Sequence, residues 1–250
     1  MVYDAHAHLL PDFIENPEFL LNKPDVIMVA NSALSLEQYR FALEFERNNV
    51  NKVITCFGIP PQMLHKMDTD FPSKALATME KHSSVIKAVG EVGLDYHWVQ
   101  KPQLIEKQRL TFISAIEFAN DSGLPIIIHS RKAETDCLAI LAKKAVTPVL
   151  MHCFAGSIED LRKALDLDYY ISIPTAVCNR KKHVKIAINT PLEKMLLETD
   201  SPFLSPVKGK KNEPMFIKFA EEKIASIKGL DSKDISRENE KNFKKFYRIA

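Results

Sequence analysis

The sequence is poor in the residues that several common kinds of binding site require. It has only seven glycines, and no G-x-G-x-x-G or G-x-x-x-x-G-K-[ST] motif follows a strand-like run. The sequence therefore lacks the main feature that would support a dinucleotide-binding or P-loop function. The four cysteines form no C-x-x-C pair, so we expect reduced thiols rather than a disulfide framework.

Long apolar stretches and an excess of one charge are also missing. No stretch approaches the roughly 18 apolar residues that a membrane span requires. The N-terminal MVYDAHAHLL has no basic segment before an apolar one, so we expect neither export nor membrane insertion, and a cytoplasmic protein with no membrane partner. The net charge of +2 predicts no polyanion partner, so any such binding must come from local clustering of cations.

What the sequence does contain is a regular alternation of two kinds of segment. Hydrophobic residues make up 46% of the 250 positions, which is typical of a globular chain with a large core. Eight short apolar or β-branched runs are predicted strands: Val2–His6, Val26–Asn31, Val53–Phe57, Ile86–Glu91, Ile126–His129, Val149–His152, Tyr169–Ile173 and Met195–Glu198. Amphipathic stretches between them are predicted helices: Ser35–Asn48, Pro102–Ser122, Ala133–Lys144, Ser157–Leu165 and Arg180–Ile188.

Eight buried strands separated by helices favour a closed α/β architecture. We predict a single-domain (β/α)8 TIM barrel over residues 1–250, with an open doubly wound sheet as the alternative. The tail from 213 to 250 is predicted to form two helices that pack outside the barrel. This arrangement leaves no room for a second domain.

Side chains that bind metals recur at the ends of the predicted strands. His6 and His8 are two residues apart, so a strand places both on one face. A single histidine at a strand end is most often structural. Here, however, metal-binding side chains end several predicted strands, and in a barrel these ends form the carboxyl-terminal face, where barrel enzymes carry their active sites. The six candidates are His6, His8, Glu91, His129, His152 and Asp200. Four imidazoles and two carboxylates suit two bridged divalent ions, which can activate a water for hydrolysis.

Several segments also resemble a known family, the TatD-type metal-dependent deoxyribonucleases, a branch of the amidohydrolase-like TIM barrels. The GEVGLDY sequence around Glu91 and the ETDSP segment are specific signatures, whereas H-x-H is shared by many metallohydrolases. The matching segments span nearly the whole chain in order: YDAHAHL at 3–9, VGEVGLDY at 89–96, PIIIHSRKA at 125–133, VLMHCFAGS at 149–157, LLETDSPFLSP at 196–206, GKKNEP at 209–214 and NFKKFYRI at 242–249.

The resemblance implies roles for the metal-binding candidates. His6 and His8 would hold a first ion with Asp200, Glu91 would bridge the two ions, and His129 would hold the second with His152. Glu91 and Asp200 would be catalytic, with Asp200 as the general base. The family uses Mg²⁺, Mn²⁺ or Zn²⁺ to cleave DNA phosphodiester bonds, commonly from the 3′ end. It implies a 3′–5′ exonuclease with DNA as substrate, and no obligate protein partner is evident.

The chain departs from the family pattern at two places. Where relatives read G-x-H-P after the third strand, this chain has Pro60 in place of a histidine that lines the site. A contact to water or phosphate is therefore expected to be missing. The segment 172–175 after the seventh run also differs from the small-residue sequence of relatives.

Cations and aromatic residues follow several strand ends. Arg131 is two residues past His129 and can bind a phosphate with its guanidinium. Tyr96 and Trp98 can either stack an unpaired base or pack within the fold. Further cations that are expected near the same rim, as phosphate contacts or solvated side chains, are Arg180, Lys181, Lys182, Lys208, Lys210 and Lys211.

The remaining candidates are interpreted structurally. Alternation along the strand points Cys153 away from the metals, toward the helices, and His65, His82 and His183 are expected at the surface. Two alternatives to a nuclease stay open. One is a bimetal amidohydrolase or esterase, including hydrolysis of aminoacyl-tRNA esters, although Glu91 replaces the modified lysine that bridges many of them. The other is a binding barrel that uses metal for structure alone.

Overall fold

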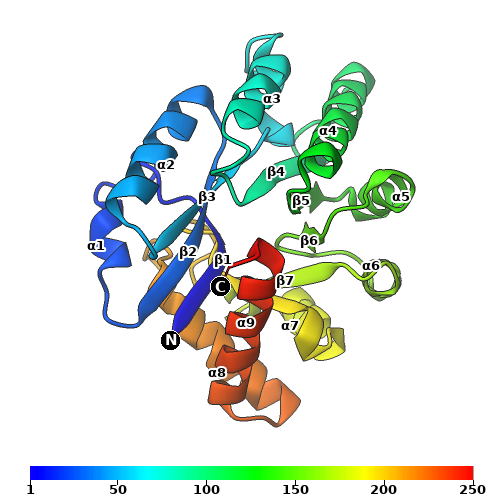
Figure 1. Ribbon diagram of the computed structural model, residues 1–250. Helices are drawn as coiled ribbons and strands as arrows, with labels where there is room; N and C mark the ends of the chain where they lie inside the picture. The colour runs from blue at the N-terminus through cyan, green and yellow to red at the C-terminus, as the bar shows by residue number, and fades with distance from the viewer. Residues whose placement is uncertain (250) are drawn as a thin grey trace.

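The computed structural model describes residues 1–249 and confirms the (β/α)8 barrel. Eight parallel strands lie side by side in chain order from β1 to β8, with helices around them (Figure 1). Their bounds are β1 Val2–Ala7, β2 Val26–Ala33, β3 Val53–Phe57, β4 Ala88–Asp95, β5 Ile126–Arg131, β6 Val149–Met151, β7 Tyr170–Pro174 and β8 Met195–Glu198. All eight predicted runs correspond to strands, and two have the predicted bounds.

The helices begin and end where local sequence signals place them. Ser35 and Ser157 are N-caps whose hydroxyls accept backbone N–H bonds, so α2 and α6 each start one residue later than predicted. Gly123 ends α4 in a left-handed conformation with φ of 66°. The bounds are α1 Pro17–Leu21, α2 Leu36–Asn48, α3 Phe71–Lys81, α4 Pro102–Ser122, α5 Glu134–Lys144, α6 Ile158–Asp166, α7 Lys181–Asn189, α8 Ile217–Lys228 and α9 Ser232–Tyr247.

None of the helices within residues 1–249 is long and apolar enough to cross a membrane.

Two of the helices, α1 and α3, are not among those that the sequence predicts. Helix α3 has no side-chain N-cap and buries only Phe71, Ala75 and Met79.

Strand β4 extends further than the sequence predicts. The expected run ends at Glu91, but the strand continues to Asp95 and pairs there with Arg131 of β5. Glu91 therefore lies within a strand and not at its end. A register shift between Val89 and Val92 interrupts the regular pairing at this point, which is typical of a bulge beside a functional site.

The core has two layers because each strand presents alternate residues to opposite faces. One layer joins the outer face of the sheet to the surrounding helices. The other contains residues from every strand and fills the barrel interior, with small side chains such as Ala5, Ala30 and Ala88 among larger ones. The interior is therefore packed from its amino-terminal end up to the polar cluster described below.

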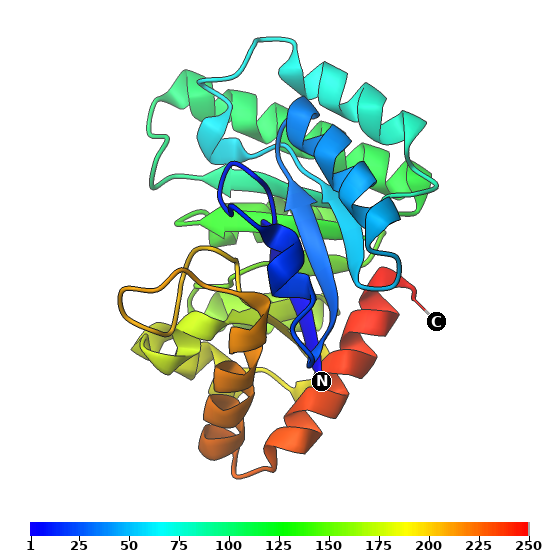
Figure 2. The same cartoon turned by 90° about the vertical axis from the view of Figure 1, so that its left-hand side faces the viewer.

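Helix α9 differs from the expectation that the tail packs only outside the barrel. Its aromatic residues Phe243, Phe246 and Tyr247 belong to the interior core layer, and the helix lies beside the start of β1 (Figure 2). Asn239 accepts a bond from Leu197 N–H of β8 at 2.9 Å and donates to the Tyr3 carbonyl of β1 at 2.8 Å. This side chain therefore links the first and last strands and helps to close the barrel.

Candidate metal centre

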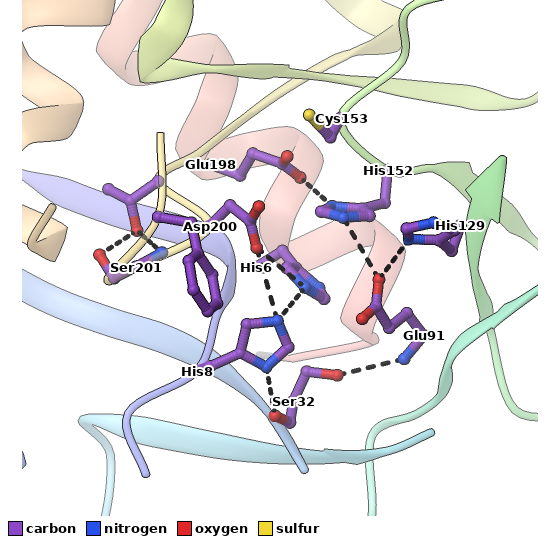
Figure 3. Close-up of polar contacts among 12 residues, drawn as sticks. His6, His8, Ser32, Glu91, His129, His152, Cys153, Glu198, Asp200 and Ser201 are labelled. Carbon is purple, nitrogen blue, oxygen red and sulfur yellow. Dashed lines mark hydrogen bonds and ion pairs between the residues drawn. The ribbon is translucent and has the colours of Figure 1, made fainter. Parts of the chain in front are cut away.

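The structure brings all six metal-binding candidates together at the carboxyl ends of the strands (Figure 3). His6 belongs to β1 and His8 follows it, whereas His129 belongs to β5 and Asp200 follows β8. Most of the cluster is shielded from solvent, and only the side chains of His129 and Asp200 reach about 15% exposure. Such burial of several ionisable groups is costly unless they are paired or bind a metal.

One half of the cluster forms where β1 meets the end of β8. The Nε2 atoms of His6 and His8 are 3.2 Å apart, and Asp200 Oδ1 lies 3.4 Å from His8 Nε2 and 3.8 Å from His6 Nε2. Asp200 has a left-handed backbone with φ of 58°, which aspartate tolerates better than most residues. Its N–H donates to the His6 carbonyl at 2.9 Å, so the backbone holds the two ligand segments together.

The other half of the cluster surrounds Glu91. Its Oε2 lies 2.9 Å from His129 Nδ1 and 3.5 Å from His152 Nε2. Two groups have ligand atoms that all lie within 4.8 Å of one another: His6, His152 and Asp200, and Glu91, His129 and His152. His152 thus joins both halves, whereas the resemblance assigns it to one ion alone.

Glycines make room for Glu91 and its neighbours. Gly93 has φ of 141°, and a Cβ there would lie 2.1 Å from the His129 carbonyl oxygen. A Cβ on Gly58 of the preceding loop would lie 2.4 Å from the Glu91 nitrogen. The backbones of three neighbouring segments therefore approach closely only because these positions have no side chain.

Three buried groups that the sequence reasoning missed hold the histidines in place. Glu198 Oε2 lies 2.9 Å from His152 Nδ1, and Asp95 Oδ2 lies 2.8 Å from His129 Nε2. The Ser32 carbonyl lies 2.8 Å from His8 Nδ1. Carboxylates and carbonyls in such positions orient histidine ligands of metals. A signal was present for the two carboxylates, because Glu198 is two residues before Asp200 and Asp95 is four after Glu91. Regular strand alternation would place residues at these spacings on one face.

The charges of the cluster depend on one another. Burial opposes protonation of His129, but attraction to Glu91 and hydrogen bonds to Asp95 and Glu91 outweigh it and raise its pKa to about 10. Burial also opposes protonation of His152, yet Glu198 above all raises its pKa to about 9. The same histidines overcome the effect of burial on Glu91 and hold its pKa well below the usual range. The carboxylates are thus compensated by positive charge at His129 and His152.

The donor set fits a metal for two further reasons. His6 Nδ1 is buried and has no hydrogen-bond partner among residues 1–249, and burial together with His152 and His8 lowers the pKa of His6 well below its usual value. Neutral imidazoles and carboxylates are the forms that bind divalent ions. A cation placed here would supply the positive charge that protonated His129 and His152 otherwise provide.

Two cavities flank the cluster. The smaller, of about 220 Å³, reaches from His152 and Asp200 to Arg131, Arg180 and the acidic Glu134. The larger, of about 630 Å³, adjoins the cluster on another side and has Pro60 in its wall, where the resemblance predicts a histidine in relatives. The positions of Arg131 and Arg180 place two guanidinium groups beside the candidate metal ligands.

The predicted substrate contacts lie in different surroundings. Trp98 and Arg131 line the larger cavity, and the Arg131 guanidinium lies 5.5 Å from the centre of the indole ring. The Tyr96 hydroxyl instead donates to Asp136 Oδ2 at 2.7 Å, and this residue lines neither cavity. Lys208 and Lys210 are exposed and also line neither cavity.

Two predictions about neighbouring residues are wrong. Cys153 lines the smaller cavity instead of turning toward the helices, because its left-handed backbone, with φ of 45°, breaks the alternation just after β6. Burial raises the pKa of its thiol well above the usual value, so it stays a thiol. His183 is 3% exposed and lines the same cavity, since α7 buries the face that carries His183, Ile186 and Ala187. His65 is exposed, as predicted, and His82 is half-buried.

Comparisons with known proteins agree with the barrel fold and with a metal-dependent hydrolase. A family model described as TatD related DNase matches residues 3–248. The chain is 32% identical to the uncharacterized metal-dependent hydrolase YabD of Bacillus subtilis over 100% of both chains, and 30% identical to the deoxyribonuclease TATDN3 of Homo sapiens over 98% of this chain and 93% of that protein. The crystal structure of YJJV, a TatD homologue from Escherichia coli, superposes with a TM-score of 0.88 at 23% identity, covering 100% of this chain and 98% of that one. The chain therefore belongs to the TatD-related DNase family of metal-dependent hydrolases.

Proposed function

We propose that the chain is a deoxyribonuclease that hydrolyses phosphodiester bonds of DNA from the 3′ end, as one hydrolase domain over residues 1–250. The observation that carries this proposal is the convergence of four histidines and two carboxylates, His8 among them through its contact with Asp200, beside a cavity that is lined by Arg131 and Arg180. The same combination, metal ligands next to guanidinium groups, suits a phosphate ester. The name deoxyribonuclease borne by the human relative supports this choice of substrate.

The proposed cofactor is a pair of divalent ions. His6, His8 and Asp200 would hold one ion, His129 and His152 the other, and Glu91 would lie between them. Bound there, the ions would polarise the phosphate and activate a water for attack. A mixed set of imidazoles and carboxylates accepts Mg²⁺, Mn²⁺ or Zn²⁺.

The protein's own side chains would perform the remaining tasks. Asp200 lines both cavities and is 16% exposed, so its carboxylate can accept a proton from an attacking water. Arg131 also lines both cavities, and its planar guanidinium can bind two oxygens of a phosphate at once. Lys208 and Lys210 would contact only a longer substrate, through its more distant phosphates.

Digestion of end-labelled DNA tests the proposal. Protein stripped of metal with a chelator is incubated with single- or double-stranded DNA, with Mg²⁺, Mn²⁺ or Zn²⁺ restored, beside the Glu91→Gln variant. We expect metal-dependent shortening from the 3′ end, abolished in the variant. DNA that stays intact with every ion would contradict the proposal and favour amide, ester or aminoacyl-tRNA substrates, whereas fragments from the 5′ end would contradict the direction alone.

A further inference from the structure

The larger cavity beside the cluster has walls of a different chemistry from the metal ligands. It measures about 630 Å³, within the range of pockets that enclose small organic molecules. Its apolar wall contains Phe13, Met63, Met67, Trp98 and Phe203. Glu91, His129 and Asp200 line the same cavity, so a ligand with one ionic and one apolar part would contact both kinds of side chain.

The apolar side chains of this wall are exposed to an unusual degree. Met63 is 39% exposed, Phe203 46% and Trp98 63%. They come from the segments after β3, β8 and β4, so three separate loops place large apolar groups at one rim. A group of exposed apolar side chains bordered by polar residues often marks a binding surface, whereas single exposed apolar side chains are ordinary.

The aromatic wall continues directly into the metal cluster. The Phe13 and Phe203 rings are 5.5 Å apart at an angle of 68°, and both lie about 6 Å from the His8 ring. The loop that carries Trp98 is fixed by Asp95, because Asp95 Oδ1 accepts the Trp98 backbone N–H at 2.8 Å while Oδ2 contacts His129. The wall is therefore held at a set position relative to the ligands.

A flat aromatic ring with polar edges matches this cavity better than a flexible chain does. Aromatic and methionine side chains stack on and pack against such a ring. The cavity also offers polar side chains for the edges of the ring, because Asp12 and Gln38, which are paired at 2.7 Å, line it as well. A nucleobase has both properties, and its phosphate would reach the cluster and Arg131.

We propose that the larger cavity is a nucleobase subsite, in which Met63 and Phe203 hold the base of the nucleotide whose phosphate lies at the metal cluster. The proposal rests on the proposed nuclease function for the identity of the ligand. Such a subsite would make the protein bind a nucleotide more tightly than a sugar phosphate that has no base.

Equilibrium binding tests this subsite without any cleavage. Trp98 is the only tryptophan and lies at the cavity rim, so its fluorescence reports an occupant. The protein is titrated, with Mg²⁺ present, with deoxyadenosine 5′-monophosphate or with 2-deoxyribose 5-phosphate, and calorimetry provides a second readout. We expect the nucleotide to bind about tenfold more tightly, a difference of about 1.4 kcal/mol, and to change the fluorescence more.

Three variants identify the wall that is responsible. Phe203→Ala and Met63→Ala should each reduce the preference for the nucleotide toward that of the sugar phosphate, while the affinity for the sugar phosphate stays the same. Phe219→Ala is the matched control, because Phe219 of α8 is 43% exposed and lines neither cavity. Circular dichroism confirms that each variant is folded.

The outcomes separate this proposal from the proposed function. Equal affinity for the two ligands, or an unchanged preference in Phe203→Ala and Met63→Ala, would overturn the subsite even if DNA is cleaved. A preference that these variants remove would support the subsite even if DNA stays intact, and the nuclease proposal alone would then fail. Binding of N-acetylphenylalaninamide in place of the nucleotide would also overturn the subsite and indicate an aminoacyl group.

Discussion

Replacing Glu198 with glutamine should weaken metal binding although Glu198 is not a proposed ligand. Its carboxylate is fully buried, lies 2.9 Å from His152 Nδ1 and accepts a hydrogen bond from the Ser172 hydroxyl. Glu198→Gln keeps the shape of the side chain and removes its charge. The imidazole of His152 then loses the anion that fixes its orientation and increases its basicity.

The size of this effect follows from comparable groups that orient metal ligands. Loss of such a partner typically lowers metal affinity by about 10–100-fold, or about 1.4–2.7 kcal/mol. Burial raises the pKa of Glu198 itself, and His152 opposes this increase, so a neutral side chain is tolerated here and the variant should fold. Competition with a chromogenic chelator measures the affinity for Zn²⁺ or Mn²⁺, and circular dichroism monitors the fold.

Glu221→Gln provides the matched control for this prediction. Glu221 of α8 is also a buried glutamate whose pKa is raised by burial, but it belongs to neither candidate metal group. We expect its variant to bind metal as the unchanged protein does. The reasoning would be refuted if Glu198→Gln, correctly folded, kept its full metal affinity or lost no more than Glu221→Gln does.

Three further perturbations have defined outcomes. Asn239→Ala removes both hydrogen bonds between α9 and the backbones of β1 and β8, so denaturant titration should show that the free energy of unfolding falls by about 2–4 kcal/mol. A decrease below about 0.5 kcal/mol would contradict the role of Asn239 in joining the first and last strands. Burial lowers the pKa of His183 from 6.5 to about 4, so the unfolded chain protonates first as pH falls. The contribution of His183 to the free energy of unfolding is therefore complete above pH 6.5 and is lost progressively toward pH 4, by about 3 kcal/mol. His183→Gln should remove this part of the pH dependence. The prediction would be refuted if the free energy of unfolding changed with pH equally in the variant and in the unchanged protein. Arg131→Ala should weaken binding of an oligonucleotide and reduce the salt slope by about 1, whereas an unchanged slope would argue against a phosphate contact.

The barrel could be predicted because its strands are short apolar runs that its helices separate. Val53–Phe57 and Met195–Glu198 have the predicted bounds, since both faces of these strands are buried and their composition contrasts with the flanking turns. The role of α9 could not be predicted in the same way. Its aromatic residues Phe243 and Phe246 indicate a packed face, but the sequence does not specify whether that face covers a helix layer or the barrel opening.

The candidate ligands could be located because parallel strands bring their carboxyl ends to one face of a barrel. His6, His129 and Asp200 follow this rule, and Glu91 joins them although β4 continues to Asp95. Cys153 departs from strand alternation because its left-handed backbone comes directly after β6. Such a local change of conformation has no clear signal in the sequence.

The larger cavity depends on contacts between loops that are far apart in the chain. Met63, Trp98 and Phe203 are separated by tens of residues, and each by itself resembles an ordinary exposed apolar side chain. Only the barrel fold places them at one rim beside Glu91. The sequence offered Trp98 as either a base contact or a packing residue, and it could not indicate the other members of this wall.

Anomalous X-ray diffraction from crystals loaded with Mn²⁺ tests the central claim most directly. The claim is that the clustered side chains at the carboxyl ends of the strands form a site for two divalent ions. We predict two anomalous peaks among His6, His8, His129, His152 and Asp200, with Glu91 between them. A crystal with no peak in this cluster, or with ions bound only elsewhere on the molecule, would contradict it.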